Sequence, residues 1–292
     1  MRIAVYSRAI NSAMVPFIQS LFINLLERGA SLKVHTILLN AMYAGETQPE
    51  AVTGFASHED IKGAVDVLFS IGGDGTLLDT IAMVKDSGIP VIGINTGRLG
   101  FLASIAKEDT QTAIDNLFQG NYTLDKRSLL CLETSVAAFG DVNYALNEFT
   151  LHKKDSSSMV TIHATLNGFY LNSYWADGLI VSTPTGSTGY SLSCGGPLIV
   201  PQSENFVITP IAPHNLNVRP IVVPDNSVIT LEMESRGQQL RATLDSRSIN
   251  VDASLQLTIK KHHFGVNLLR LNNEQFLTTL RNKLMWGIDK RN

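Results

Sequence analysis

The chain has 292 residues, and its 23 Lys and Arg against 26 Asp and Glu give a formal net charge of −3. Hydrophobic residues make up 44% and charged residues 17%, a balance that excludes a disordered chain and suits one large domain or two modest ones. Because the chain is slightly acidic, it has no diffuse positive field, and neither nucleic acid nor an anionic membrane is expected as a partner.

The spacing of the cysteines and the lengths of the apolar runs indicate where in the cell the protein is expected. Cys131 and Cys194 lie far apart and have neither CxxC nor CxxH spacing, so we expect two reduced thiols rather than a disulfide framework or a zinc site. No apolar run reaches the roughly 18 residues that a spanning helix needs, and the opening residues are strand-like rather than typical of a signal peptide. We therefore expect a cytoplasmic protein without a membrane segment.

The first part of the chain alternates between strand and helix patterns. Continuous apolar runs predict strands at residues 3–6, 32–38, 64–71 and 90–94. Apolar residues at helical spacing predict helices at residues 14–26 and 76–85. Residues 40–57 are polar and contain glycine. Strands that are apolar throughout are typical of parallel sheets, so residues 1–120 predict an α/β domain with a Rossmann-like parallel sheet.

From about residue 121 the pattern changes to an alternation of apolar and polar residues, which predicts a mostly antiparallel, β-rich domain over residues 121–271. Its clearest hairpin joins residues 159–166 and 169–175 through Asn167-Gly168, a pair that favours a type I′ turn. Further strands are expected at residues 144–151, 178–182, 228–233, 240–244 and 255–259. A helix is expected at residues 274–286, so that residues 272–292 could pack back on the first domain.

Two glycine-rich loops follow predicted strands in the first domain. Residues 71–78 run from a buried strand through Gly72-Gly73-Asp74-Gly75 into a helix start, where free N–H groups can hold an anion. The alternative is a tight turn in which Asp74 merely caps the helix. Residues 92–102 end another strand in a second glycine loop, or form a plain connection. If the two strands are neighbours, both loops meet at one edge of the sheet.

Two further motifs lie in the second domain. Asn147 and Glu148 adjoin in a run expected to pair in a sheet, where alternation sends them to opposite faces unless a bulge or strand end intervenes. They could bind an adenosine, or could be solvated strand positions. Residues 177–197 pack Ser, Thr and Gly into a short span that can bind phosphate or ribose, and Tyr190 offers a ring for a base; an ordinary polar loop is the alternative.

These four motifs, in this order and spacing over residues 71–197, resemble those of the NAD kinase family. The resemblance implies a two-domain fold with the site in the cleft between the domains. It also implies a phosphotransferase that moves the γ-phosphoryl group of ATP to the 2′-hydroxyl of the adenosine ribose of NAD, giving NADP. Without a Walker lysine, the chain needs a divalent cation, most plausibly Mg²⁺ carried in with ATP. Which side chains contact the metal is unknown from the sequence.

The resemblance also implies roles for single residues. Asp74 matches the general base, Gly75 a position against the nucleotide, Asn147 and Glu148 the pair that holds the adenosine, and Asp177 the acid facing the nicotinamide half. The adenosine-binding loop corresponds to Thr188, Gly189, Tyr190, Ser191, Leu192 and Ser193. Ala212 matches a backbone contact.

The chain departs from the family pattern at two positions. Gly189 stands where the loop usually has Ala, and the loss of one methyl is expected to loosen packing beside the base without altering the chemistry. Arg247 stands where Gln or another polar residue is common, and its role is left open.

Two alternative functions belong to other classes of protein. One is a non-catalytic regulator that keeps the fold and binds NAD or NADP, and the other is a kinase that acts on a lipid or sugar hydroxyl. The absence of an exposed apolar stretch and the loop at residues 188–193 argue against the lipid or sugar kinase. The resemblance further implies a homodimer or homotetramer built through the β-rich domain.

Overall fold

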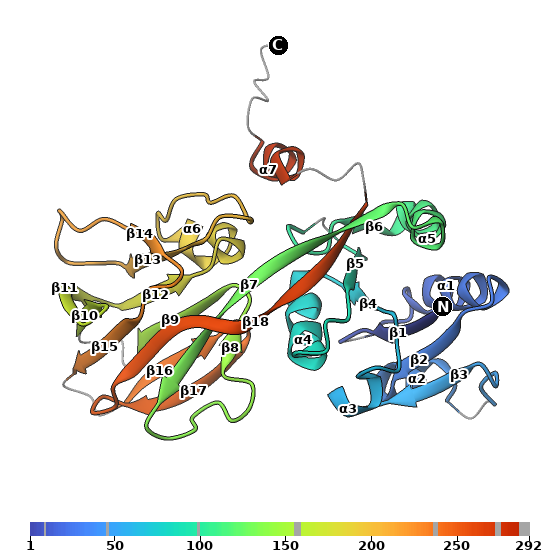
Figure 1. Ribbon diagram of the computed structural model, residues 1–292, viewed down its shortest axis with the longest axis horizontal. Helices are drawn as coiled ribbons and strands as arrows, with labels where there is room; N and C mark the ends of the chain where they lie inside the picture. The colour runs from blue at the N-terminus through green and yellow to red at the C-terminus, as the bar shows by residue number, and fades with distance from the viewer. Residues whose placement is uncertain are drawn as a thin grey trace, which may run out of the picture. The chain divides into compact units, whose positions relative to one another are not determined.

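The computed structural model of the protein describes residues 1–8, 10–44, 47–97, 100–154, 159–235, 239–271 and 276–285 (Figure 1). The chain forms two compact units: unit 1 comprises residues 1–126 and 266–292, and unit 2 comprises residues 127–265. Each unit has its own cluster of buried hydrophobic side chains. The predicted combination of an α/β part and an antiparallel β-rich part is confirmed.

Unit 1 is built on a parallel sheet with the strand order β5-β4-β1-β2-β3. Its strands are β1 (Arg2–Tyr6), β2 (Ser31–His35), β3 (Val52–Phe55), β4 (Val67–Gly72), β5 (Val91–Asn95) and the short β6 (Ile105–Ala106). Its helices are α1 (Val15–Glu27), α2 (Thr36–Met42), α3 (His58–Ile61), α4 (Asp74–Val84), η1 (Lys107–Asp109), α5 (Thr110–Gln119) and α7 (Phe276–Leu284).

The strands β1, β4 and β5 of this sheet are buried on both faces, which explains their largely apolar sequences. Every residue of β5 is buried, and so is every residue of β4 except its last, Gly72. Helices supply the cover: α1, for example, buries Ile18, Leu21, Phe22 and Leu25, which recur every three or four residues. The strands predicted at residues 64–71 and 90–94 are therefore confirmed as buried parallel strands.

Three local predictions for this unit were wrong or incomplete. The strand predicted at residues 32–38 ends at His35, because Leu38 and Met42 lie four residues apart on the buried face of α2. The polar region at residues 40–57 contains β3. Helix α5 was not predicted, although Gly120 ends it in the left-handed conformation that favours glycine, with φ of 75°.

Unit 2 consists of antiparallel strands in two sheets. One sheet has the order β14-β13-β12-β9-β16-β17, and the strands β11-β10-β15-β18 belong to the other. The elements are β7 (Tyr122–Thr134), β8 (Tyr144–Ala145), β9 (Glu148–Lys153), β10 (Val160–Leu166), β11 (Phe169–Ala176), β12 (Gly178–Ser182), η2 (Thr185–Thr188), α6 (Tyr190–Ser193), β13 (Asn205–Ile211), β14 (Ile221–Pro224), β15 (Ile229–Glu234), β16 (Gln239–Leu244), β17 (Arg247–Asp252) and β18 (Leu257–Leu271). β7 enters from unit 1, and β18 continues into it.

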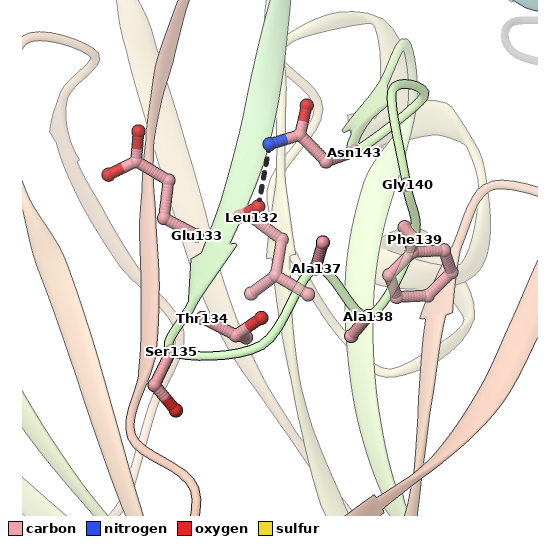
Figure 2. A pocket seen from close by; sticks show the side chains of 9 residues that line it. All are labelled: Leu132, Glu133, Thr134, Ser135, Ala137, Ala138, Phe139, Gly140 and Asn143. Carbon is pink, nitrogen blue, oxygen red and sulfur yellow. Dashed lines mark hydrogen bonds between the residues drawn. The ribbon is translucent and has the colours of Figure 1, made fainter.

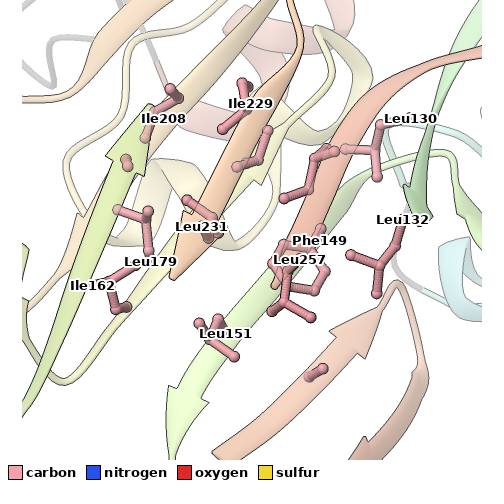
Figure 3. Close-up of a cluster of buried hydrophobic side chains, with 14 of the residues drawn as sticks. Leu130, Leu132, Phe149, Leu151, Ile162, Leu179, Ile208, Ile229, Leu231 and Leu257 are labelled. Atoms are coloured by element: carbon pink, nitrogen blue, oxygen red, sulfur yellow. The ribbon is translucent and has the colours of Figure 1, made fainter. Parts of the chain in front are cut away.

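The core of unit 2 contains residues from both sheets (Figure 3). Phe149 and Leu179 come from the first sheet, and Ile162 and Leu231 come from the second. Two antiparallel sheets that share one buried cluster form a sandwich. The predicted hairpin is confirmed, because Asn167 and Gly168 have φ angles of 52° and 82°, as a type I′ turn requires.

Two predictions at the ends of elements need correction. The strand expected at residues 255–259 is the beginning of the much longer β18. The helix expected at residues 274–286 is present as α7, and its first two and last residues lie outside the described part of the chain. Within unit 1, the ammonium group of Lys283 on α7 lies 5.9 Å from the centroid of the Phe101 ring.

Candidate active site

The two glycine-rich loops of unit 1 meet at one edge of its sheet, as predicted. Strands β4 and β5 are parallel neighbours, with Ile71 opposite Ile94 and Gly72 opposite Asn95. Both loops therefore leave the carboxyl ends of adjacent strands, the place where open α/β sheets bind ligands.

The carboxylate of Asp74 is held by the second of these loops. Asp74 is the first residue of α4, and its oxygens accept N–H bonds from Phe101 at 2.9 Å, Leu102 at 3.1 Å and Ala103 at 2.9 Å. The alternative considered from the sequence was a turn in which Asp74 merely caps its own helix. The N-cap of α4 is instead Gly73, and no side-chain capping bond is present there. The three N–H groups orient the carboxylate at the turn.

This arrangement requires glycine at position 100. A Cβ atom on Gly100 would lie 1.8 Å from Oδ1 of Asp74, which is far inside van der Waals contact. The loop can therefore close over the carboxylate only because residue 100 has no side chain.

A cation that the sequence analysis missed lies beside Gly75. A Cβ atom on Gly75 would be 3.8 Å from Nη1 of Arg8, whose guanidinium forms an ion pair with Asp79 of α4 at 2.6 Å. The hydroxyl group of Tyr6 also donates to Asp79, at 3.3 Å. Burial and the nearby Asp79 carboxylate raise the pKa of Tyr6 to about 12, so this hydroxyl stays protonated.

In unit 2 the strand predicted at residues 144–151 is interrupted at Leu146 and Asn147, between β8 and β9. The carboxylate of Asp245 accepts the N–H groups of Leu146 at 2.8 Å, Asn147 at 2.8 Å and Glu148 at 3.2 Å. These groups are consequently not used in a sheet ladder, and the alternation that would separate Asn147 from Glu148 is broken. The possibility of a strand end, considered from the sequence, is the one the structure shows.

Glu148 has an unusual environment for a carboxyl group. Its Oε2 atom is buried and has no hydrogen-bond partner. Burial, followed by the charge of Asp245, raises the pKa of Glu148 to about 8. Burial raises the pKa of Asp245 as well, while its three N–H bonds and Arg247 act in the opposite direction. Glu148 is therefore protonated at neutral pH.

The Ser- and Thr-rich loop packs against this pair. The N–H group of Thr183 donates to the carbonyl oxygen of Asn147 at 2.9 Å, and its hydroxyl group donates to that of Leu146 at 2.5 Å. At Gly189, a Cβ atom would lie 3.2 Å from Oε2 of Glu148 and 3.2 Å from the carbonyl oxygen of Gly186. The absence of a methyl group at this position therefore relieves a tight contact with the Glu148 carboxyl group.

Several hydroxyl groups of this loop have partners inside unit 2. Ser187 donates to the carbonyl oxygen of Pro184 at 2.7 Å, and Ser191 bonds to the hydroxyl group of Thr209 at 2.9 Å. Thr188 donates to the carbonyl oxygen of Thr185 at 3.2 Å. These hydroxyl groups shape the loop, whereas the side chain of Tyr190 is exposed.

Asp177 and Ala212 lie at the other end of β12. The N–H group of Asp177 donates to the carbonyl oxygen of Ile211, so Asp177 and Ala212 flank the same end of the β12–β13 pair. Glu148 is opposite Ser182, five residues further along, which corresponds to roughly 17 Å at about 3.4 Å per residue. Lys153 forms an ion pair with Asp177 at 2.6 Å. Asp177 and Glu148 thus lie at opposite ends of the paired strands β9 and β12.

Tyr190 begins α6, directly after Gly189. Burial, followed by the neighbouring Cys194 and the charge of Asp177, raises the pKa of its phenol.

The guanidinium of Arg247 donates to the carbonyl oxygens of Val142 and Tyr144, which joins β17 to the segment around β8. This answers the question that the sequence left open for Arg247.

A cavity of 520 Å³ in unit 2 lies elsewhere (Figure 2). Its lining comes from the end of β7 and the connection to β8, where Asn143 donates to the carbonyl oxygen of Leu132 at 2.9 Å. None of the residues predicted for the site lines this cavity. We therefore do not assign it to the nucleotides.

Comparison with known proteins identifies the family. Residues 32–122 match the ATP-NAD kinase N-terminal domain, and residues 146–271 match the ATP-NAD kinase C-terminal domain. The chain is 47% identical over 290 residues to an NAD kinase of Cytophaga hutchinsonii, with 99% of each chain covered. It is 46% identical over 294 residues to an NAD kinase of Flavobacterium psychrophilum, with 100% of each covered.

The chain belongs to the NAD kinase family. The membership predicted from four sequence motifs is confirmed, and with it the prediction of a phosphotransferase. Solved structures share the fold: a yeast NADH kinase complexed with NADH has a TM-score of 0.88 at 19% identity, covering 99% of this chain and 88% of that one. An NAD kinase from Archaeoglobus fulgidus in complex with ATP has a TM-score of 0.76 at 24% identity, covering 98% and 99%.

Membrane-spanning helices and clusters of metal-binding side chains are two features that the described residues lack. No helix among them is both long enough and apolar enough to cross a lipid bilayer. Within the same residues, no three His, Cys, Asp or Glu side chains gather in a way that could hold a metal ion.

The environment of Glu148 predicts a pH-dependent effect on stability. The pKa of Glu148 is raised from 4.5 to about 8, so folding favours its protonated form. This contribution is fully present below pH 4.5 and is lost as the pH rises to about 8. Relative to Glu148→Gln, the parent should therefore lose on the order of 5 kcal/mol of unfolding free energy over this pH range, and no more above it.

Urea unfolding of both proteins at several pH values measures this difference. Glu204→Gln, which changes an exposed carboxyl group of the same unit, corrects for the loss of a carboxyl group as such. A constant difference between parent and Glu148→Gln from pH 4 to pH 9 would show that Glu148 ionises normally.

The contact at Gly100 predicts a strong effect of a single methyl group. Gly100→Ala should displace the loop or the Asp74 carboxylate. If Asp74 is the general base that the resemblance implies, kinase turnover should fall by about 100-fold, because a small misplacement of a catalytic group has an effect of that size. Gly97→Ala is the matched control, since its Cβ would lie 3.9 Å from Oδ1 of Asn95, an ordinary contact. Equal turnover of the two variants in steady-state assays would contradict the prediction.

Proposed function

We propose that this member of the NAD kinase family transfers the γ-phosphoryl group of ATP to the 2′-hydroxyl of the adenosine ribose of NAD, giving NADP and ADP. The observation that carries the proposal is the match of both domains of the family along the chain, with the ordered carboxylate of Asp74 inside the N-terminal one. The relatives described above are named as kinases, and they give no support to the alternative of a non-catalytic NAD- or NADP-binding regulator.

The proposed role of Asp74 is that of general base. An ionised carboxylate offers about four lone-pair sites, and Asp74 accepts three N–H bonds, so one site remains for a hydroxyl group. The ribose 2′-oxygen would bond to the γ-phosphorus as the bond to the bridging oxygen of ADP breaks, and the hydroxyl proton would pass to Asp74. This chemistry depends mainly on positioning, which supports a role for a carboxylate oriented by its surroundings.

We propose that unit 2 holds the dinucleotide. The amide group of Asn147 and the protonated carboxyl group of Glu148 can both donate hydrogen bonds to acceptors of the adenosine, and Tyr190 can stack on a ring. Asp177 is proposed to face the nicotinamide half. The two halves of a dinucleotide suit residues at opposite ends of the β9–β12 pair. The remaining proposed contacts are Gly75, Thr188, Gly189, Ser191, Leu192, Ser193 and Ala212.

The cation that neutralises the triphosphate is proposed to enter with ATP as part of the substrate. Mg²⁺ is often bound mainly through phosphates and water, with few protein ligands. Because the described residues offer no cluster for a metal ion, we assign no protein ligand to it.

The central test is NADP formation from NAD, ATP and Mg²⁺, followed with an NADP-specific dehydrogenase. The parent should turn over, and Asp74→Asn should lose about 100- to 10,000-fold in kcat, the usual contribution of general acid–base catalysis, while keeping its thermal stability. Chelation of Mg²⁺ should stop the reaction. Stabilisation of the parent by NAD without any turnover would support the regulator, and near-full activity of Asp74→Asn would remove Asp74 from the mechanism.

We further propose a homodimer or homotetramer in the cytoplasm. Large apolar side chains are exposed on and near β11 of unit 2: Phe169 is 79% exposed, Tyr170 68% and Leu216 90%. Large exposed apolar side chains of this kind are typical of protein interfaces.

Light scattering after size exclusion should give a mass of two or four times 31.8 kDa. The double substitution Phe169→Ser with Tyr170→Ser should lower that mass, because it removes apolar area from the proposed interface. Leu277→Ser, which changes an exposed apolar residue of α7, is the control. A parent that elutes as a monomer at micromolar concentration would overturn the proposal.

A further inference from the structure

The loop that orients Asp74 is held from its other side by an arginine. Arg270, near the end of β18, donates to the hydroxyl oxygen of Ser104 at 2.6 Å and to the carbonyl oxygens of Leu102 and Phe101, each at 3.4 Å. Its side chain is 13% exposed, and Asp125 lies 3.5 Å from its Nε atom. All of these residues belong to unit 1.

The bonds of Arg270 and Asp74 involve the same peptide groups. One peptide unit presents the carbonyl oxygen of Phe101 to Arg270 and the N–H group of Leu102 to Asp74. The next unit presents the carbonyl oxygen of Leu102 to Arg270 and the N–H group of Ala103 to Asp74. Each peptide dipole therefore points from the guanidinium toward the carboxylate.

This alignment has an electrostatic consequence. A cation at the carbonyl end of a peptide group polarises it and strengthens the hydrogen bond that its N–H group donates. The guanidinium is well suited to this position because its planar fork carries several donors and stays charged. The third carbonyl oxygen of the loop, that of Ala103, accepts from the side-chain amide of Asn95 at 3.4 Å, so the whole turn is fixed.

We propose that Arg270 is a positioning residue of the kinase reaction, which orients the Asp74 carboxylate through the two peptide groups between Phe101 and Ala103. Arg270 acts through the loop and does not contact the reacting atoms. Asp125 in turn holds the guanidinium. The inference rests on the proposed role of Asp74 as general base.

Arg270→Ala is the first test. It leaves the peptide carbonyls without their cation, so the carboxylate loses its fixed orientation, and kcat should fall by about 10- to 100-fold while KM for NAD and for ATP changes little. Guanidinium ion at low millimolar concentration should restore part of kcat, because it can occupy the vacated position. Arg28→Ala, which removes another arginine of unit 1 that is paired with Asp115, is the control and should keep the parent kcat.

Chemical rescue separates positioning from general stability. Recovery of kcat in Arg270→Ala by guanidinium, and none in Asp74→Ala, would support the inference. Parent-like kcat in Arg270→Ala, or a loss that guanidinium does not reverse, would overturn it. If Arg270→Ala does not fold, Ser104→Ala removes the 2.6 Å contact alone and should give a smaller fall in kcat with unchanged KM. Unchanged kcat in that variant would then overturn the inference.

A failure of this inference can be distinguished from a failure of the proposed function. NADP formation by the parent and its loss in Asp74→Asn test the kinase and the base. A parent that makes NADP and an Arg270→Ala variant that makes it equally fast would leave the kinase in place and remove only the role of Arg270.

Discussion

The structure depends on one repeated arrangement: the carboxylate of a partly buried aspartate accepts three consecutive backbone N–H groups from a distant segment of the chain. In unit 1, Asp74 accepts three consecutive N–H groups at residues 101–103. In unit 2, Asp245 accepts three at residues 146–148. An unsatisfied buried charge would be costly, and N–H groups used in this way cannot join a ladder or a helix. Each carboxylate therefore determines the path of a loop, and both loops carry residues proposed for function.

Close packing of these loops explains the positions of two glycines. At Gly100 a side chain would collide with the carboxylate of Asp74, and at Gly189 it would press on the carboxyl group of Glu148. Neither residue has a positive φ angle, so conformational freedom is not the reason. What both positions require is space for a carboxyl group, which is a different demand from that of the left-handed Gly168 in the hairpin turn.

The sequence predicts what short-range patterns determine. Continuous apolar runs identified the parallel strands β4 and β5, and their adjacency brought the two glycine loops together as expected. Contacts between residues that are far apart along the chain could not be predicted from the sequence. The break before Glu148 depends on Asp245, which lies 97 positions further along the chain, and Arg270 reaches a loop 166 positions before it. The periodicity of apolar residues carries no information on contacts between distant residues. For that reason the alternation over residues 144–151 predicted a continuous strand.

The carboxyl groups of the two units are distinguished by what surrounds them. Asp74 accepts three N–H bonds, and Arg270 contacts the carbonyl oxygens of two of the three peptide groups that donate them. This arrangement fixes the direction in which the remaining lone pair of Asp74 points. The backbone N–H group of Glu148 donates to Asp245, and no group donates to its Oε2 atom. Burial therefore keeps the Glu148 carboxyl group protonated at neutral pH. A fixed acceptor suits the removal of a proton from a hydroxyl group, and a neutral acid suits the donation of a hydrogen bond to a nucleoside. We therefore propose that the carboxyl group serves catalysis at Asp74 and recognition at Glu148, because backbone donors are present at Asp74 and absent at Glu148 Oε2.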